Sequence, residues 1–553
     1  MLETSSILFE EETAFLKKDK PGGAYLPIKF KDFKQDVDAL GTALLDLGLK
    51  DKKIAVIGEN RYEWALTYLA VVNGVGTIVP IDKELPENEI KHLLEKSKAS
   101  AVIYSDKLKK PITNIINDLV DLEHVISMDA EEDINNMMTL DKLINKGKTL
   151  LHNGNKQYLD MKIDCDKASI LLFTSGTTGL AKGVKLSHKN ICSNIMAMSQ
   201  YVFTSKEDTI LSVLPLHHTY ECTCGVMTPL YTGACIAFCE GLKHIVKNLN
   251  ESKATVMLGV PLLFESMYTR VWRKVEKEGK ANKLRKGIKI SRSLKKVGID
   301  QSKKFFKSIH EALGGHVRLF ISGAAAIDPD IIQCFNDIGI RMIQGYGLTE
   351  CSPIVAVNRD RYSKHASAGQ ALQGTEIEID DPDENGIGEI LCKSDSVMLG
   401  YFENDQETEA AFLDGWFKTG DYGYLDEEGF LFLTGRKKNV IVTKNGKNIF
   451  PEEVEFYLNK SDYIKECIVF GKEDEKNGDA LICANIVLDT EYIDEVKQNH
   501  TDDELGELIQ EIIHNINSKM PLYKRIRRFN IKKDELEKTT TKKIIRYGTN
   551  IKP

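Results

Sequence analysis

The sequence predicts an α/β protein with a large N-terminal domain of mostly parallel sheets flanked by helices, followed by a smaller α+β domain. The main observation is an alternation of short apolar runs with segments of helical periodicity, which begins near residue 37 and returns after residue 170. This alternation is typical of parallel sheets covered by helices on both faces. The size agrees, because 553 residues suggest several domains, and 42% hydrophobic and 28% charged residues suit a folded protein.

The elements of the N-terminal part follow from this pattern. Val37, Leu40, Leu44 and Leu47 repeat at helical spacing until Gly48 stops the pattern. Strands are then expected at 53–58, 77–81, 101–104, 170–173 and 210–214. Helices are expected at 61–72, 87–96 and 190–201.

The character of the chain changes after about residue 370, where short strands alternate with turns. Strands at 376–379, 389–392 and 430–434 predict a small antiparallel, β-barrel-like unit over about 370–435. A second boundary is expected near Gly435, which gives an N-terminal domain at 1–435 and a C-terminal domain at 436–553. In the latter, helices are expected at 452–459 and 504–518, and strands at 466–471 and 480–487.

The charge and the apolar runs exclude several classes of protein. A formal net charge of −8 and a pI of about 5.9 argue against nucleic-acid binding, which usually needs a basic excess. Apolar runs such as 76–81 fall far short of the ~20 residues that span a bilayer, and the N-terminus lacks the pattern of a secretory signal. The 11 scattered cysteines lack zinc-site spacing and fit a reducing compartment, so we expect a cytoplasmic protein.

Residues 270–307 form a basic segment in this acidic chain. They hold 15 Lys or Arg against Glu276, Glu278 and Asp300, a local excess of 12 positive charges. The plain interpretation is a solvated, partly helical surface. The alternatives are peripheral association with an anionic membrane, with Trp272 as an interfacial anchor, and contact with an acidic partner or phosphate.

The motif with the most chemical information lies at residues 172–183, L-F-T-S-G-T-T-G-L-A-K-G. A predicted strand runs into a loop of glycines and hydroxylated residues that ends in Lys182. Glycines let several backbone N–H groups point at one anion, and lysine adds a positive charge for phosphate. A Walker P-loop does not fit, because Ala181 stands at the place of its second glycine and Gly183 at the place of its Ser or Thr.

This segment resembles the phosphate-binding motif of the adenylate-forming superfamily, which includes acyl-CoA synthetases, peptide-synthetase adenylation domains and beetle luciferase. Ala181 is a departure, since many members have proline there. Further motifs follow in the family's order and extend the resemblance over nearly the whole chain. They are L-P-L-H-H at 214–218, I-S-G-A-A at 321–325, Q-G-Y-G-L-T-E at 344–350, G-W-F-K-T-G-D at 415–421, T-G-R-K-K at 434–438, N-G-K-N-I-F-P-E-E-V-E at 445–455 and K-T-T-T-K-K-I at 538–544.

The resemblance implies a binding site for ATP and Mg²⁺. Glu350 and Thr174 would be the magnesium ligands and part of the catalytic set, in line with the preference of this ion for oxygen donors. Tyr346 would offer a flat face to adenine, whereas Asp421 and Arg436 would hold the ribose. The full set implied for ATP or AMP is Thr174, Ser175, Gly176, Thr177, Thr178, Gly179, Lys182, Gly323, Ala324, Ala325, Gly345, Tyr346, Gly347, Thr349, Glu350, Asp421, Arg436 and Lys543.

The resemblance also assigns residues outside the nucleotide-binding motifs. Laying the family's K-T-x-x-G-K over residues 538–543 makes Lys543 the catalytic cation at the α-phosphate and puts Lys542 in place of glycine. His218 would lie in the acyl pocket. Lys438 would be the hinge of a mobile C-terminal domain. Gly446 would line the CoA channel, where the missing Cβ leaves room for a narrow tether.

The activity implied is that of an AMP-forming acid–thiol ligase, which activates a fatty acid with ATP and transfers the acyl group to CoA. The basic segment and the L-P-L-H-H-T-Y-E sequence resemble bacterial long-chain acyl-CoA ligases most. Two alternatives stay open: acyl carrier protein as the acceptor, and a non-enzymatic acyl-nucleotide sensor, which would not need Lys543. The apolar segments 226–237 and 256–267 would line an acyl tunnel or belong to the core. A monomer and a homodimer are both compatible with the sequence.

Overall fold

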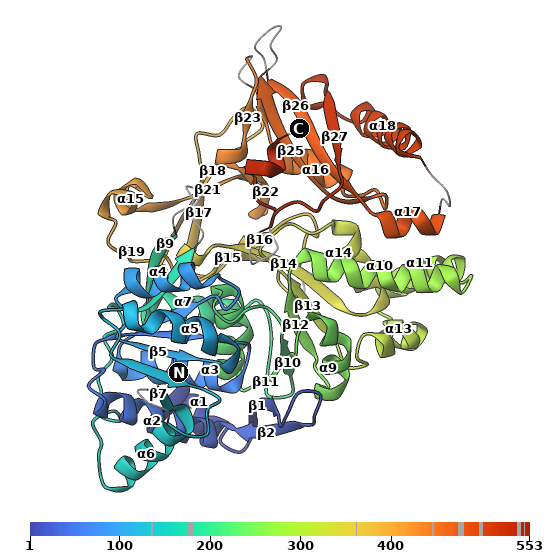
Figure 1. Ribbon diagram of the computed structural model, residues 1–553. Coiled ribbons are helices and arrows are strands. Elements are labelled where there is room, and N and C mark those ends of the chain that lie inside the picture. The colour runs from blue at the N-terminus through green and yellow to red at the C-terminus, as the bar shows by residue number, and fades with distance from the viewer. Residues whose placement is uncertain are drawn as a thin grey trace. The chain divides into compact units, whose positions relative to one another are not determined.

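The computed structural model describes residues 1–133, 137–174, 181–360, 362–444, 447–473, 480–496, 501–538, 544–546 and 548–552. The chain divides into two units (Figure 1). Unit 1 comprises 1–377, 392–417 and 427–431, and unit 2 comprises 378–391, 418–426 and 432–553.

The first sheet of unit 1 is mostly parallel, as expected. Its strand order is β19-β9-β8-β4-β3-β5-β6-β7, and the neighbours from β8 to β7 pair in parallel. At one edge β9 and β19 continue the sheet in antiparallel orientation. The strands are β3 (Lys53–Ile57), β4 (Thr77–Ile81), β5 (Ala101–Tyr104), β6 (His124–Ser127), β7 (Met137–Thr139), β8 (Ala168–Thr174), β9 (Lys182–Ser187) and β19 (Gly400–Tyr401).

Helices pack around this sheet, and α2, α3, α4 and α7 lie at positions that the periodicity indicated, whereas α5 and α6 were not predicted. Helix α2 (Phe30–Asp46) buries the predicted leucine face, and Gly48 follows it with a left-handed φ of 79°. Ser187 caps α7 (His188–Ser199) through a reciprocal capping box with Asn190. The other helices are α3 (Tyr62–Ala70), α4 (Glu87–Ser97), α5 (Lys109–Ile115) and α6 (Leu140–His152).

The second sheet of unit 1 is parallel at its centre and antiparallel at its ends. Strands β11, β10, β12, β13 and β14 are parallel neighbours in that order. Their core continues into the helices of the basic segment, α10 and α11, which pack against each other and against α14. The elements are β1 (Thr13–Lys18), β2 (Tyr25–Lys29), β10 (Thr209–Ser212), β11 (Cys235–Phe238), β12 (Val256–Gly259), β13 (Leu319–Ser322), β14 (Arg341–Gly347), β15 (Ile354–Val357), β16 (Gly369–Ala371), α10 (Pro261–Lys277), α11 (Ala281–Lys296) and α14 (Pro329–Ile338).

Of the strands after residue 370, β22 pairs with β16 in antiparallel orientation, and no closed barrel forms among the described strands. The residues of these strands are divided between the two units. They are β17 (Thr375–Asp380), β18 (Gly388–Ser394), β21 (Trp416–Leu425) and β22 (Phe430–Arg436).

Unit 2 contains the α+β arrangement expected near the C-terminus. Strands β25 (Ile464–Glu473), β26 (Ala480–Leu488) and β27 (Arg528–Lys532) form a sheet, with β25 antiparallel and β27 parallel to β26. Helices α16 (Pro451–Leu458) and α18 (Asp502–Ser518) share its apolar core. In neither unit does a described helix have the length and hydropathy needed to cross a membrane.

Candidate active site

The phosphate motif lies at the antiparallel edge of the first sheet. Thr174 ends β8 and pairs directly with Lys182, which begins β9 instead of belonging to the preceding loop. The Lys182 ammonium lies 2.6 Å from Oε2 of Glu407 and 5.2 Å from the centre of the Tyr401 ring. The five motif residues Ser175, Gly176, Thr177, Thr178 and Gly179 lie outside the described residues.

The predicted metal ligand Glu350 is tied to the same edge. It lies in a short helical turn, Thr349–Cys351, directly after β14. Its Oε1 accepts a hydrogen bond from the Tyr401 hydroxyl at 3.1 Å, and its carbonyl oxygen accepts one from the Met398 N–H at 2.7 Å. Because β19 pairs with β9, the segment around Tyr401 contacts both Glu350 and Lys182.

The donor set fits Mg²⁺ bound together with a nucleotide. Glu350 and Thr174 offer oxygen atoms, which this ion prefers. Within the described ranges, no group of three or more His, Cys, Asp or Glu side chains is arranged to hold a metal ion. A magnesium ion bound with a nucleotide takes most of its ligands from phosphates and water, so two protein donors would suffice.

The two segments predicted to bind adenosine leave adjacent parallel strands, β13 and β14, at the same edge of the second sheet. Gly323, Ala324 and Ala325 follow β13, and Ala324 has a left-handed φ of 69°. A Cβ at Gly323 would lie 2.7 Å from the Tyr220 ring, so this position needs glycine.

The other segment, Gly345, Tyr346 and Gly347, forms the end of β14 and is followed by Thr349. The Tyr346 side chain is buried in the structure. Ligands of open α/β sheets bind outside the carboxyl ends of strands, and both segments lie there.

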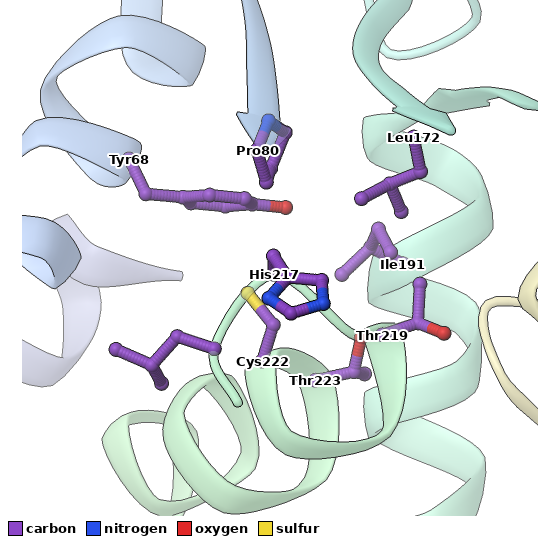
Figure 2. A pocket seen from close by; sticks show the side chains of 9 residues that line it. Tyr68, Pro80, Leu172, Ile191, His217, Thr219, Cys222 and Thr223 are labelled. Carbon is purple, nitrogen blue, oxygen red and sulfur yellow. The ribbon is translucent and has the colours of Figure 1, made fainter. Parts of the chain in front are cut away.

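Figure 2 shows a pocket that contains the first histidine of the L-P-L-H-H motif in its lining. His217 lines it, and its ring centre lies 4.1 Å from that of His218. Burial lowers the pKa of His217 to about 3. The ring is therefore neutral at pH 7, and its 3.5 Å approach to Asp82 Oδ2 is not an ion pair. The other lining residues are Tyr68, Pro80, Leu172, Ile191, Leu216, Thr219, Cys222 and Thr223.

A buried carboxyl group lies directly after this motif. Glu221 belongs to a π-helical segment, Tyr220–Met227, and is 0% exposed. Burial raises the pKa of Glu221 to about 8. The turn before it is held by Asn60, whose Nδ2 donates to the Leu214 carbonyl at 2.6 Å.

In unit 2, Asp421 and Arg436 are brought together. Arg436 Nε lies 2.9 Å from Oδ1 of the buried Asp421. Lys438, the predicted hinge, lies in a 3₁₀ turn at Lys437–Asn439, and burial lowers its pKa. The predicted channel residue Gly446 lies outside the described residues.

The segment assigned to the catalytic lysine is anchored on both sides, although Lys543 itself and Lys542 lie outside the described residues. Lys538 pairs with Ile544 in an isolated bridge, and its ammonium lies 2.6 Å from Glu466. On the far side, Arg546 forms an ion pair with Glu455.

Four residues of interest were missed by the sequence patterns: Asp82, Glu221, Tyr401 and Glu407. Tyr401 and Glu407 are 219 and 225 residues away from Lys182 along the chain, as their numbers show. Their contacts depend on the pairing of β19 with β9, which no local motif indicates. Glu221 was detectable only as an acidic residue within an apolar run.

Comparison with known proteins gives the same family for both parts of the chain. Residues 9–402 match the family model described as AMP-binding enzyme, and residues 438–551 match that of the AMP-binding enzyme C-terminal domain.

Curated relatives are similar over most of the chain. The long-chain-fatty-acid–CoA ligase FadD15 of Mycobacterium bovis is 27% identical over 498 residues, which cover 87% of this chain and 80% of the relative. Long-chain-fatty-acid–CoA ligase 5 of Rattus norvegicus is 30% identical over 493 residues, covering 82% and 70%. A chloroplastic long-chain-fatty-acid–[acyl-carrier-protein] ligase of Arabidopsis thaliana, AEE15, is 25% identical over 535 residues, covering 83% and 72%.

Solved structures share the fold at lower identity. The anthranilate CoA ligase AuaEII in complex with anthranoyl-AMP has a TM-score of 0.78 at 21% identity, covering 99% of this chain and 95% of the other. The o-succinylbenzoate CoA synthetase MenE of Bacillus subtilis, in complex with ATP and magnesium, has a TM-score of 0.73 at 21% identity, covering 99% and 98%.

Proposed function

The chain belongs to the AMP-binding enzyme family, and from that premise we propose that it activates a long-chain fatty acid with ATP and transfers the acyl group to CoA. The observation that carries the proposal is the arrangement of Thr174, Lys182 and Glu350 around one sheet edge. Relatives named as long-chain-fatty-acid–CoA ligases support the choice of substrate.

In the first step, a carboxylate oxygen of the fatty acid bonds to the α-phosphorus of ATP while the bond to pyrophosphate breaks. The carboxylate is already ionised at pH 7, so no general base is required. Lys182 supplies positive charge to the phosphates. Glu350 and Thr174 would hold Mg²⁺, which when bound neutralises phosphate oxygens.

The remaining residues of the predicted nucleotide site would bind the adenosine part of ATP. Tyr346 would face the adenine, with the backbone of Gly345, Gly347 and Thr349 beside it. Gly323, Ala324 and Ala325 would form the second loop of the site. Asp421 accepts hydrogen bonds from the ribose hydroxyls, and Arg436 donates to the same ribose. Ser175, Gly176, Thr177, Thr178 and Gly179 would surround the phosphates.

In the second step, the CoA sulfur bonds to the acyl carbonyl carbon, AMP leaves with the bonding electron pair and the thiol proton is released. AMP is a good leaving group, which makes this step feasible. Lys543 would stabilise the charge at the α-phosphate in the first step. We assign residues 436–553 as a mobile domain with its hinge at Lys438. Rotation of this domain between the two steps would remove Lys543 from the site and bring Gly446 to the CoA channel. His218 would border the acyl group.

The experiment that tests this function measures pyrophosphate release from hexanoate, decanoate, palmitate, oleate and benzoate, with and without CoA. We expect palmitate and oleate to sustain repeated turnover when CoA is present, because each buried CH₂ contributes about 0.8 kcal/mol. A preference for benzoate or hexanoate would contradict the fatty-acid assignment. Faster turnover with a phosphopantetheinylated acyl carrier protein than with CoA would favour the alternative acceptor of the Arabidopsis relative.

We also propose peripheral association with anionic membranes through the basic segment. One face of α11 is buried through Leu284 and Ile288, and the lysines of the other face are exposed. The predicted anchor Trp272 does not fit this role, because it packs against the core and under Arg285, 5.5 Å from its ring centre. Exposed apolar side chains lie nearby instead, namely Ile290, Val297, Ile299 and Phe305.

The cysteines support a reducing compartment, and we propose the cytoplasm. All 11 are free thiols, and Cys165 is the one in the exposed class. A homodimer is the alternative to a monomer, and sedimentation velocity distinguishes the two.

A further inference from the structure

The side chain of Tyr401 contacts both Glu350 and Lys182. Its hydroxyl donates to Glu350 Oε1 at 3.1 Å, and the Lys182 ammonium lies 5.2 Å from its ring centre. A lysine at that distance from an aromatic centre is attracted by the negative face of the ring. One side chain therefore interacts with the metal-ligand candidate through its edge and with the phosphate-binding lysine through its ring.

The position of Tyr401 is fixed by its backbone. Its N–H donates to Thr408 Oγ1 at 2.9 Å, and it pairs with Val184 of β9. The neighbouring Phe402 N–H donates to the Gly183 carbonyl at 2.6 Å. The residue is 7% exposed, so few other rotamers are available to its side chain. The hydroxyl is thus held in place before any ligand binds.

A hydrogen bond to one carboxylate oxygen orients the other. A carboxylate that ligates a metal is usually held by such a partner, and loss of the partner weakens metal binding. The hydroxyl of Tyr401 is a donor at neutral pH and cannot itself replace the carboxylate as an anionic ligand. Its contact with Glu350 therefore affects orientation and leaves the charge of the site unchanged.

The contact with Lys182 is of a different kind. The Lys182 side chain is 24% exposed and that of its partner Glu407 is 44% exposed, so this ion pair is held weakly and a phosphate can replace the carboxylate. The ring of Tyr401 carries no charge that would compete with phosphate. The ring restricts the position of the Lys182 ammonium while a phosphate replaces the Glu407 carboxylate.

We propose that Tyr401 is a positioning residue of the nucleotide site, which orients Glu350 toward Mg²⁺ through its hydroxyl and holds Lys182 toward phosphate through its ring. The proposal rests on the ATP site assigned above. The two parts of the Tyr401 side chain have different effects under this proposal. The hydroxyl affects the ATP affinity that depends on Mg²⁺, and the ring affects the ATP affinity that does not.

The test is isothermal titration calorimetry with ATP, once with excess Mg²⁺ and once with EDTA. Tyr401→Phe keeps the ring and removes the hydroxyl, so we expect a Kd for MgATP about tenfold higher and an unchanged Kd in EDTA. Tyr401→Leu removes both groups and should raise both Kd values. Tyr231→Phe, at an exposed tyrosine, is the matched control and should change neither.

The outcomes distinguish this proposal from the function on which it rests. If the wild type binds no ATP under either condition, the assigned function fails. If the wild type binds MgATP more tightly than ATP, and Tyr401→Phe does so to the same degree, only the role of Tyr401 is overturned. An equal loss in Mg²⁺ and EDTA for Tyr401→Phe also overturns it, because that pattern indicates a general disturbance of the site. Thermal melting of each variant without ligand shows that the protein is folded.

Discussion

Lys182 and Glu407, 225 residues apart, form an ion pair of 2.6 Å at the place where a nucleotide triphosphate is expected. The Glu407 carboxylate binds the Lys182 ammonium, which would otherwise be available to a phosphate group. Because both side chains are partly exposed, the pair is worth at most about 1 kcal/mol. Glu407 would therefore compete with a phosphate bound at Lys182 without blocking it.

Replacing Glu407 by Gln should make pyrophosphate bind more tightly. The expected change is a Kd lower by about two- to fivefold, the factor that corresponds to an exposed ion pair. Inhibition of the forward reaction by added pyrophosphate measures it. Glu409→Gln is the control and should leave inhibition unchanged, because Glu409 is an exposed residue of the helix that also holds Glu407, α15 (Asp405–Ala410). Weaker inhibition in Glu407→Gln would mean that the pair assists phosphate binding.

Replacing Glu350 by Gln should slow adenylate formation by about 10²-fold or more, on the scale of losing one preorganised charged group. The amide keeps the shape and removes the charge that attracts Mg²⁺. Single-turnover formation of acyl-adenylate over a series of Mg²⁺ concentrations is the measurement. Near-normal rates at low Mg²⁺ would rule out Glu350 as a ligand.

Replacing Lys543 by Ala should remove adenylate formation and spare transfer to CoA from supplied acyl-AMP. The reason is that the lysine is expected to act in one of two domain positions. Lys542→Ala is the matched neighbour and should retain both half-reactions. A larger loss in Lys542→Ala would place the catalytic lysine one residue earlier.

Binding to vesicles should depend on the exposed lysines of the basic segment. We expect salt-sensitive co-sedimentation with vesicles that contain phosphatidylserine and weak binding to phosphatidylcholine alone, since each lysine near an anionic surface contributes about 1 kcal/mol. The variant changes to Gln five lysines of the segment that have no ion-pair partner among the described residues, namely Lys286, Lys289, Lys296, Lys303 and Lys304.

A variant with the same loss of charge elsewhere on unit 1 is the control for this experiment. It changes Lys50, Lys110, Lys156, Lys162 and Lys243 to Gln. Equal co-sedimentation of the two variants would contradict the membrane proposal and indicate that the basic segment is only a solvated surface. A third variant, Val297→Ser with Phe305→Ser, tests the exposed apolar side chains and should lose the binding that persists at high salt.

The stability of unit 1 should depend on the protonation of Glu221. Its pKa is raised by burial to about 8, above the ordinary value near 4.3, so its proton stabilises the folded state fully below about pH 4. That stabilisation is lost as pH rises through about 8, at about 1.4 kcal/mol per pH unit within the window. Glu221→Gln should therefore gain stability relative to the wild type between pH 5.5 and pH 8.5 in urea denaturation. The exposed Glu207→Gln should show no such trend.

The periodicity of apolar residues predicted helices and strands well where the buried residues of an element follow a regular pattern. Strands β4 and β5 have the expected bounds, and α2 ends just before Gly48 because glycine permits the left-handed turn there. The segment Tyr220–Met227 is π-helical, which a 3.6-residue period does not indicate. The chain is also kinked at Asn73 and Gly74, just after α3, where both residues have non-helical backbone angles.

The parts of the site that depend on contacts between residues far apart in the sequence were harder to predict. The motifs marked Lys182 and Glu350, but Tyr401 lies between them through strand pairing over more than 200 residues. The packing of Trp272 against the core was also not predicted, because a tryptophan in a basic segment has the same local sequence pattern whether its indole faces lipid or the core.

The distribution of the thiols makes the protein suited to site-specific labelling. Of the 11 cysteines, Cys165 is exposed, whereas burial raises the pKa of Cys222 and Cys235 to about 12 and that of Cys239 and Cys334 to about 11. Maleimides react with the thiolate, so at neutral pH a dye should attach first at Cys165 without any engineered substitution. A fluorophore there, paired with a second one in unit 2, would follow the proposed domain rotation in single molecules of the otherwise natural enzyme.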